Sequence, residues 1–304
     1  MTSLARADAA LILGHVLGRD RSWLVAHPDA QLSDEEAERF ESLCARRREG
    51  TPVAYLIGTA GFYGREFLVD ENVLVPRPET EHLIDEALAF IRPEMRVLDV
   101  GTGSGAIACT IAAQTRAHVD AVDLLPAAVE IAVKNARRLG VAERCKFYVG
   151  DLLDSVRRNR YDVVIANLPY IPTGDLPKPP DPASFEPQPA LDGGPDGLSQ
   201  YRRLMPGLPE LINEGGMVLL ECAPPTFQPL KALVQLALPN FVIEGGKDYS
   251  GLDRYVQAYD GAARDCYVPV EGRLNPSEAT DGESSENRAT GAAEARRERP
   301  RDGT

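Results

Sequence analysis

The residues that could do chemistry begin where a predicted buried strand ends. Apolar residues over 163–166 indicate a strand covered on both faces. The run stops at a tetrapeptide of Asn167, Leu168, Pro169 and Tyr170. Ligands of open α/β sheets bind outside the carboxyl ends of the strands, where a proline-stiffened turn carrying an amide and a ring can grip an amide or a nucleobase. The alternative is an ordinary strand end with an Asn-initiated turn.

A glycine-rich turn lies earlier in the chain, between a predicted strand over 96–100 and a helix over 106–114. It consists of Gly101, Thr102, Gly103, Ser104 and Gly105. Glycines let backbone approach a ligand at the positive end of a helix. The next strand ends in Asp123, about twenty residues on, where an acid can accept both hydroxyls of a ribose. The turn lacks the glycine spacing of dinucleotide binders and follows Asp99, which favours an adenosine-bearing sulfonium over NAD.

A third strand, over 146–149, is followed by Gly150, Asp151 and Leu152. Asp151 can accept a hydrogen bond from an adenine amino group, and the alternative is that it caps a helix. With the strand that ends at Asn167, four successive strands have polar residues or glycines at their carboxyl ends. This pattern predicts one cleft along one edge of a parallel sheet.

Composition narrows the class of partner. The chain has 304 residues and a formal net charge of -13, which disfavours the basic surface on which nucleic-acid affinity depends. A protein or small-molecule substrate fits better. The five cysteines include no CxxC pair and indicate reduced thiols, the four histidines lack metal-ligand spacing, and no apolar run approaches the roughly 18 residues of a membrane span. We therefore expect a cytoplasmic protein with neither a metal site nor a membrane segment.

Helical signals dominate the first part of the chain. Helices are predicted over 4–17, 23–26 and 52–56, and a capping box that begins at Ser33 starts another, which ends near Arg48. Over 58–75 apolar residues recur at every second position, which predicts a β-hairpin. We expect a small helical module over 1–57 that packs as a lid or recognises a partner, with the hairpin and linker over 58–78 behind it.

The remaining elements complete an α/β domain. A proline- and glycine-rich loop is expected over 173–198, and loops of this length inside a domain are usually functional or disordered. The other predicted elements are helices over 79–90, 125–139, 199–213 and 226–238 and strands over 217–221, 241–244 and 255–259. The domain is expected to span 79–265, and the polar tail over 266–304 is expected to be disordered.

Several short motifs, in this order and spacing, resemble the HemK/PrmC class of protein glutamine methyltransferases. The resemblance extends to about Tyr259 and rests on Gly61–Gly64 with Phe67, Leu74–Glu81, Gly101–Gly105, Asn167–Tyr170, Glu186–Leu198 and Ser250–Arg254. One position departs, because the family usually has Asn-Pro-Pro-Tyr where this chain has Leu168. Asn-Leu-Pro-Tyr also occurs in ribosomal RNA adenine dimethyltransferases.

The resemblance implies a Rossmann-like class I fold and S-adenosylmethionine as methyl donor. The implied substrate is the glutamine of the Gly-Gly-Gln motif in class 1 peptide chain release factors, with 1–57 as the recognition domain. Asn167 and the carbonyl of Leu168 would accept the two amide hydrogens, Pro169 would fix the turn and Tyr170 would pack on the amide. The cofactor would lie on the Gly101–Gly105 turn, with Asn167 beside it, Asp123 at its ribose and Asp151 and Leu152 at its adenine. Arg77 and Glu79 would line the substrate entrance or pack a hinge.

Other functions remain open at this stage. An RNA or DNA adenine N6 methyltransferase would need a basic groove, which the composition does not indicate. Methylation of a glutamine in a ribosomal protein fits the segment over 76–81 less well than methylation of a release factor. A catalytically silent protein that binds S-adenosylmethionine is the third alternative, and the intact Asn167 and glycine turn argue against it.

Overall fold

The computed structural model describes residues 4–248 and 250–261, so the predicted disordered tail lies outside the described residues. Four helices come first, α1 (Arg6–Leu17), α2 (Arg21–Ala26), α3 (Asp34–Arg48) and α4 (Val53–Ile57). The capping box is confirmed, because the Ser33 hydroxyl accepts from the Glu36 amide while the Glu36 carboxylate accepts from the Ser33 amide. Within the described ranges no helix is long and apolar enough to cross a membrane.

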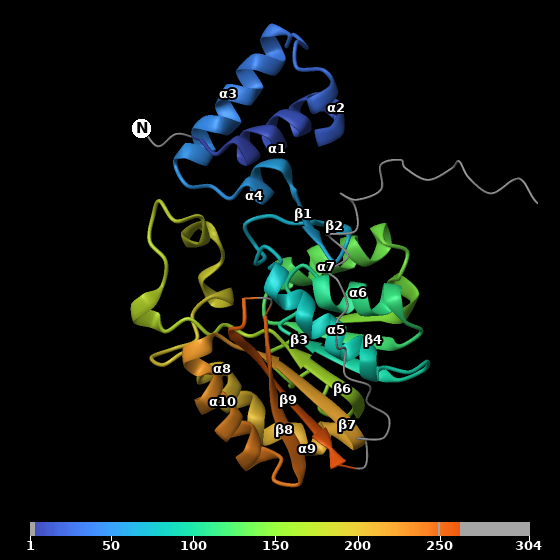
Figure 1. Cartoon of the computed structure of the whole chain (residues 1–304). Helices are drawn as coiled ribbons and strands as arrows, with labels where there is room; N and C mark the ends of the chain where they lie inside the picture. The colour runs from blue at the N-terminus through green and yellow to red at the C-terminus, as the bar shows by residue number, and fades with distance from the viewer. Residues whose placement is uncertain (1–3, 249, 262–304) are drawn as a thin grey trace, which may run out of the picture. The chain divides into compact units, whose positions relative to one another are not determined.

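A seven-stranded sheet forms the centre of the α/β region (Figure 1). Its order is β5-β4-β3-β6-β7-β9-β8, with β3 to β7 parallel to one another and β9 antiparallel to both β7 and β8. The strands are β3 (Arg96–Val100), β4 (His118–Asp123), β5 (Cys145–Val149), β6 (Tyr161–Ala166), β7 (Ile212–Glu221), β8 (Phe241–Lys247) and β9 (Asp253–Asp260). The predicted Rossmann-like sheet is confirmed.

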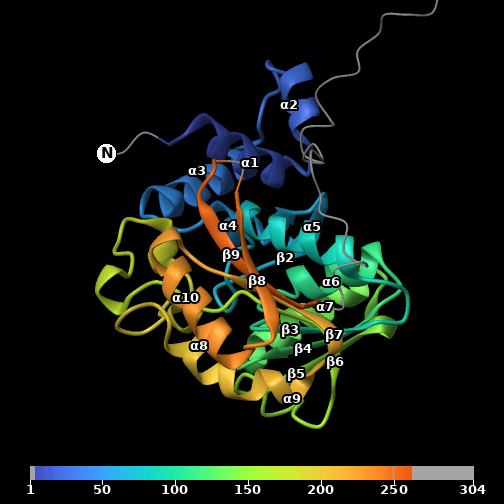
Figure 2. The same ribbon diagram turned by 60° about the horizontal axis from the view of Figure 1, so that its bottom comes forward.

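Helices cover both faces of this sheet (Figure 2). Alternate residues of β6 enter two cores: Val163 and Ile165 face one, and Val164 and Ala166 face the other. The first core takes α5 (Glu81–Phe90), α6 (Ala106–Gln114) and part of α7 (Pro126–Arg138), and the second takes α8 (Ser199–Leu204), α9 (Leu208–Leu211) and α10 (Pro224–Ala237). A parallel strand buried on both faces reads as a continuous apolar run, which is why β6 could be predicted.

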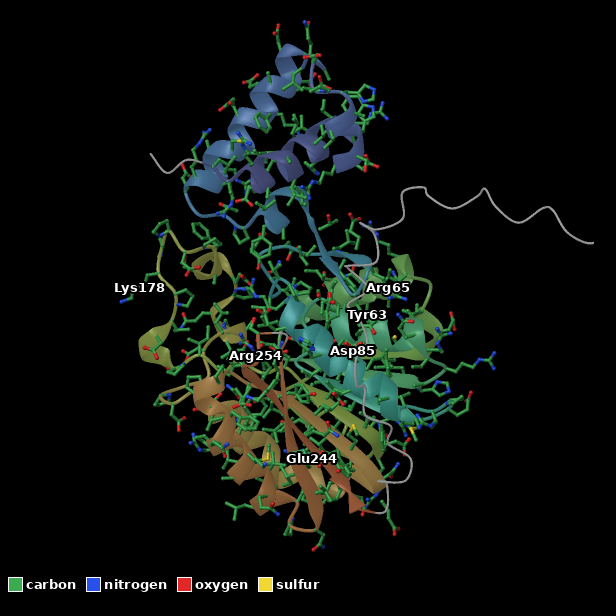
Figure 3. The ribbon with its side chains drawn as sticks, viewed as in Figure 1. Tyr63, Arg65, Asp85, Lys178, Glu244 and Arg254 are labelled. Carbon is green, nitrogen blue, oxygen red and sulfur yellow. The ribbon has the colours of Figure 1, made fainter. Side chains whose placement is uncertain are left out.

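The predicted hairpin is formed by β1 (Thr59–Phe62) and β2 (Arg65–Leu68), which pair antiparallel. Its turn is held on α5, since the Tyr63 amide donates to Glu81 and the Tyr63 hydroxyl donates to Asp85 at 2.8 Å (Figure 3). The buried Asn135 side chain exchanges two hydrogen bonds with the backbone of Leu68. A third bond, from the Asn135 amide to the Ser104 carbonyl at 2.8 Å, ties the hairpin to the glycine turn.

One predicted element is wrong. The helix expected over 199–213 is divided into α8, a 3-10 turn over Met205–Gly207 and α9, and β7 begins at Ile212 rather than at 217. Pro206 and Pro209 each fall in the first turn of a new segment, because proline has no N–H to continue the preceding helix. The predicted loop over 173–198 contains three short 3-10 turns and an isolated β-bridge from Asp192 to Ile171.

Candidate active site

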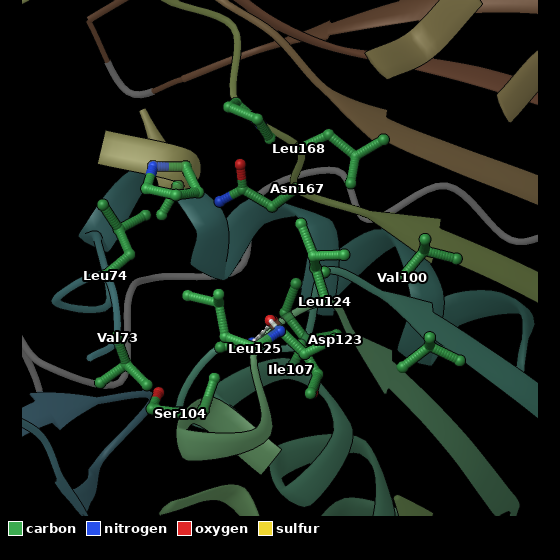
Figure 4. A pocket seen from close by; sticks show the side chains of 18 of the residues that line it. Val73, Leu74, Val100, Ser104, Ile107, Asp123, Leu124, Leu125, Asn167 and Leu168 are labelled. Atoms are coloured by element: carbon green, nitrogen blue, oxygen red, sulfur yellow. Dashed lines mark hydrogen bonds between the residues drawn. The ribbon is translucent and has the colours of Figure 1, made fainter. Parts of the chain in front are cut away.

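The main pocket opens at the carboxyl ends of the parallel strands. It has a volume of about 1050 Å³, which includes space open to solvent, and its wall contains the last residues of β3 and β4 and the residues that follow β6. Figure 4 shows Asn167, Leu74 and Leu125 around the same space. Predicted site residues that line it are Arg77, Gly101, Thr102, Gly103, Ser104, Asp123, Asp151, Leu152, Asn167, Leu168 and Pro169. Predicted site residues outside its wall are Glu79, Gly105 and Tyr170.

The glycine turn passes close to the tetrapeptide that follows β6. Gly101 has a φ of 78°, and a Cβ placed on it would lie 3.0 Å from Leu168 Cδ2 and 3.4 Å from the Asn167 carbonyl oxygen. A side chain at this position would therefore be strained by the backbone and by the neighbouring loop. The Gly101 and Thr102 amides donate to the Val122 carbonyl at 2.9 and 3.0 Å, which fixes the turn on β4.

The Asp123 carboxylate is oriented by the backbone on both sides. Its Oδ2 accepts from the Gly103 amide at 2.8 Å and its Oδ1 accepts from the Leu125 amide at 2.9 Å. Burial raises the pKa of Asp123, and these amide donors partly oppose that shift. An ionised carboxylate has about four acceptor positions, so each oxygen can still accept from a ligand in the pocket.

Asp99 holds the glycine turn in place through hydrogen bonds. It is fully buried, and its Oδ2 accepts from the Thr102 hydroxyl at 2.6 Å and from the Ala108 amide at 3.2 Å. Burial raises the pKa of Asp99 to about 7. Asp99 is absent from the pocket wall, so its contacts are with the turn rather than with a ligand.

Asp151 and Leu152 follow β5 and line the pocket. No helix begins at Asp151, so the capping alternative is wrong. The Asp151 side chain instead pairs with Arg203 of α8, which also lines the pocket. Leu152 has a φ of 50°, an uncommon backbone conformation for a leucine.

The Asn167 side chain is oriented by Thr80, which precedes α5. Asn167 Nδ2 donates to Thr80 Oγ1 at 3.1 Å. This bond uses one of the two N–H groups of Nδ2, and Oδ1 can accept a hydrogen bond from a ligand in the pocket that Asn167 lines. Leu168 is 4% exposed, and its amide donates to the Tyr201 hydroxyl at 3.3 Å.

Tyr170 points to a buried acid at the end of β7. Its hydroxyl donates to Glu221 Oε1 at 3.2 Å, and burial raises its pKa. Glu221 is 1% exposed, and burial raises its pKa to about 7. The contacts of Tyr170 are thus with the layer of side chains behind the pocket wall.

Arg77 joins the pocket to the long loop after β6. It pairs with Glu186, whose side chain is 1% exposed and also accepts from the Val75 amide at 3.0 Å. Burial raises the pKa of Glu186, while Arg77 lowers it. This ion pair fixes the loop over 173–198 against the segment that leads into α5.

Three residues of the site were missed by sequence reasoning: Thr80, Tyr201 and Glu221. Glu221 could have been found, because it is a polar residue at the carboxyl end of an apolar strand, as Asp123 and Asn167 are. Thr80 has no such signal, since its contact with Asn167 joins residues 87 positions apart.

Two family patterns match the sequence. The PrmC N-terminal domain matches residues 2–58, and a methyltransferase domain family matches residues 91–221. A methyltransferase crystal structure from Pyrococcus furiosus has the same fold, with a TM-score of 0.50 and 19% identity over 73% of this chain and 99% of that one.

Curated relatives match most of the chain. The release factor glutamine methyltransferase of Moorella thermoacetica is 39% identical over 257 residues, covering 84% of this chain and 91% of the relative. The enzyme of the same name from Bacillus cereus is 38% identical over 257 residues, covering 82% and 90%. The chain therefore belongs to the release factor glutamine methyltransferase family.

Proposed function

We propose that the chain transfers a methyl group from S-adenosylmethionine to the side-chain amide nitrogen of the glutamine in the Gly-Gly-Gln motif of class 1 peptide chain release factors. The observation that supports this best is the orientation of Asn167. Its Nδ2 donates to Thr80, and its Oδ1 can accept a hydrogen bond in the pocket beside the glycine turn. The names of the relatives support the same substrate.

The pocket suits a nucleoside with a short charged chain. A Cβ added to Gly103 would have no atom within 4 Å, so the turn is open where a methionyl group would lie. Asp123 would hold the ribose, and Leu152 with Asp151 would border the adenine. When bound, S-adenosylmethionine supplies a methyl carbon on a sulfonium, which the substrate nitrogen attacks as the carbon–sulfur bond breaks.

The chain's own residues would act mainly by positioning. An amide nitrogen is a poor nucleophile because its lone pair is delocalised. If Asn167 Oδ1 and the Leu168 carbonyl accept its two hydrogens, the nitrogen is turned toward the methyl carbon and held there. Orientation of this kind can supply up to roughly 7 to 11 kcal/mol of a barrier. Methylation would first give a positively charged amide, which is strongly acidic and would release one proton to water, so a strong general base is not required.

Residues 1–57 would recognise the protein substrate. All residues of α2 are at least partly exposed, with Val25 at 74% exposure, and Leu11 of α1 is 51% exposed. Such apolar side chains can contact a partner. Val25→Ser is expected to raise KM for the release factor without changing kcat. Because release factors act on ribosomes, we place the enzyme in the cytoplasm, without a nucleic-acid or membrane surface of its own.

A labelling experiment tests the function. The protein is incubated with radiolabelled S-adenosylmethionine and either a release factor, its variant with the motif Gln replaced by Ala, or total RNA. We expect label on the first substrate alone. Label on RNA, or equal label on the variant, would contradict the proposal, and a lack of label on every substrate would support a silent binding protein.

A further inference from the structure

Four neighbouring parallel strands set the order of the proposed site residues along the main pocket. The strands lie in the order β5-β4-β3-β6, and at their carboxyl ends are Asp151, Asp123, the Gly101–Gly105 turn and Asn167. The ends of β4 and β5 are joined by a hydrogen bond of 2.9 Å from the Gly150 amide to the Asp123 carbonyl. If Asp123 holds the ribose, Asp151 lies next to it on the side away from Asn167, where the adenine would lie.

Asp151 is held by α8, the helix that follows the long loop after β6. Arg203 Nη2 donates to Asp151 Oδ2 at 2.5 Å, and Arg203 Nη1 donates to Gln200 Oε1 at 2.8 Å, one turn earlier in the same helix. All three residues line the main pocket. Because the guanidinium is planar and presents its donors in a rigid fork, Arg203 fixes the two acceptor oxygens relative to each other.

Each partner of Arg203 keeps one polar atom for the pocket. Asp151 Oδ1 and Gln200 Nε2 make no hydrogen bond to any residue that the structure describes. An ionised carboxylate only accepts, and an amide nitrogen only donates. The two side chains thus offer an acceptor and a donor that are held by the same guanidinium. The 6-amino group of adenine donates and the ring nitrogen beside it accepts, which is the complementary pattern.

The ion pair of Asp151 and Arg203 also bounds the main pocket. A second cavity of about 970 Å³, which includes space open to solvent, shares Asp151, Leu152 and Arg203 with the main pocket as wall residues. The side chains of Asp151 and Arg203 are 39% and 52% exposed, so the pair contributes little to stability. Substitution of Arg203 should therefore leave the fold intact, which makes its role in binding testable.

We propose that Arg203 is a positioning residue which, by holding Asp151 and Gln200, makes the pocket select adenine over purines that carry an oxygen in place of the 6-amino group. The inference rests on the proposed function, which places the adenine of S-adenosylmethionine at Asp151. In hypoxanthine the 6-oxygen is an acceptor, so it would face the Asp151 carboxylate and be repelled. Without Arg203 the carboxylate and the amide could turn, and the difference between the two bases would shrink.

The test measures calorimetric affinities for S-adenosylhomocysteine and for S-inosylhomocysteine, its analogue with hypoxanthine. The full-length wild type is expected to bind the adenine compound about 10- to 100-fold more tightly, since the analogue leaves a charged group without its hydrogen bond. Arg203→Met removes the donors and is expected to reduce this ratio about 3- to 10-fold. A purely structural loss would weaken both ligands equally. An unchanged ratio in Arg203→Met would therefore overturn the inference.

Arg202→Met is the matched control. Arg202 precedes Arg203 on α8 and forms a similarly exposed ion pair, with Asp196, but it does not line the pocket. The ratio of the two affinities is expected to stay within about twofold of the wild-type ratio. A change as large as that in Arg203→Met would overturn the inference.

Asp151→Asn supplies a second, independent test. Because Arg203 can only donate, the oxygen of the new amide is expected to face Arg203 and its N–H groups to face the pocket. Those groups can donate to the 6-oxygen of hypoxanthine, so this variant should bind S-inosylhomocysteine at least as tightly as S-adenosylhomocysteine. A preference for adenine as large as that of the wild type would overturn the inference.

Other outcomes separate the inference from the function on which it rests. A wild type that labels the release factor but binds the two compounds equally would overturn the inference alone. A wild type that binds neither compound and does not label the release factor would overturn the proposed function and this inference together.

Discussion

The backbone amide of Leu168 donates a hydrogen bond of 3.3 Å to the hydroxyl of Tyr201. Tyr201 is fully buried, and its hydroxyl donates a hydrogen bond to the Glu221 carbonyl. The hydroxyl therefore satisfies one buried donor and one buried acceptor at the same time. A proline at position 168, which is usual in the HemK/PrmC family, would have no backbone N–H to donate to this hydroxyl.

Tyr201→Phe is expected to destabilise the protein because it leaves both of these backbone groups without a partner. The cost should be about 1 to 3 kcal/mol for each unsatisfied group, measured as the change in the free energy of unfolding in urea. The loss should be smaller in a Leu168→Pro background, where the amide is already absent. Equal losses in the two backgrounds would show that the Leu168 bond contributes nothing.

Much of the fold and part of the candidate site could be predicted because they depend on local sequence patterns. β6 is a continuous apolar run and ends in a polar residue, so Asn167 could be placed at the ligand-binding edge before the sheet order was known. The Ser33 capping box is similarly local. The prediction of one helix over 199–213 was wrong. The sequence alone does not show whether Pro206 and Pro209 lie in the first turns of new segments, as they do, or within one irregular helix.

The residues behind the motif could not be predicted in the same way. Thr80 and Glu221 meet Asn167 and Tyr170 only because η1 (Pro78–Thr80), β6 and β7 come together at one edge of the sheet. The spacing of these residues along the chain does not indicate that they are in contact. The orientation of the Asn167 amide is a property of these contacts, so it becomes visible only in the structure.

Gly101→Ala is expected to lower both stability and affinity for S-adenosylhomocysteine. The backbone at Gly101 has a φ of 78°, and the new methyl group would also press on Leu168. The backbone strain alone should cost about 1 to 3 kcal/mol. Gly58→Ala is the matched control, because Gly58 has a φ of 77° with no atom within 4 Å of the added Cβ. Equal losses of stability in the two variants would exclude a contribution from the close approach to Leu168.

Stability is expected to fall as pH rises toward neutrality. Burial raises the folded-state pKa of both Asp99 and Glu221 to about 7, from usual values of 3.8 and 4.5. The folded protein therefore holds protons that the unfolded chain has released, so the stabilisation is complete below about pH 4 and is lost as pH approaches 7. Each group contributes a slope of up to about 1.4 kcal/mol per pH unit.

Urea unfolding of wild type and Glu221→Gln between pH 4 and 8 checks this dependence. The variant has lost one of the two groups, so its stability should fall less steeply between about pH 4.5 and 7. Above that window the difference between the two curves should become constant. Parallel curves throughout would mean that Glu221 ionises in the folded protein as it does in the unfolded chain.

Asn167→Ala is expected to abolish most of the methyl transfer and to leave cofactor binding nearly intact. The variant removes the oriented Oδ1 acceptor, and loss of one comparable oriented group from an active site costs roughly 10²- to 10³-fold in kcat. The glycine turn and Asp123 do not hydrogen bond to the Asn167 side chain, whose bond is to Thr80. Titration with S-adenosylhomocysteine alongside the kinetic assay separates the two effects. A loss of cofactor affinity as large as the loss of kcat would show that Asn167 holds the cofactor rather than the substrate amide.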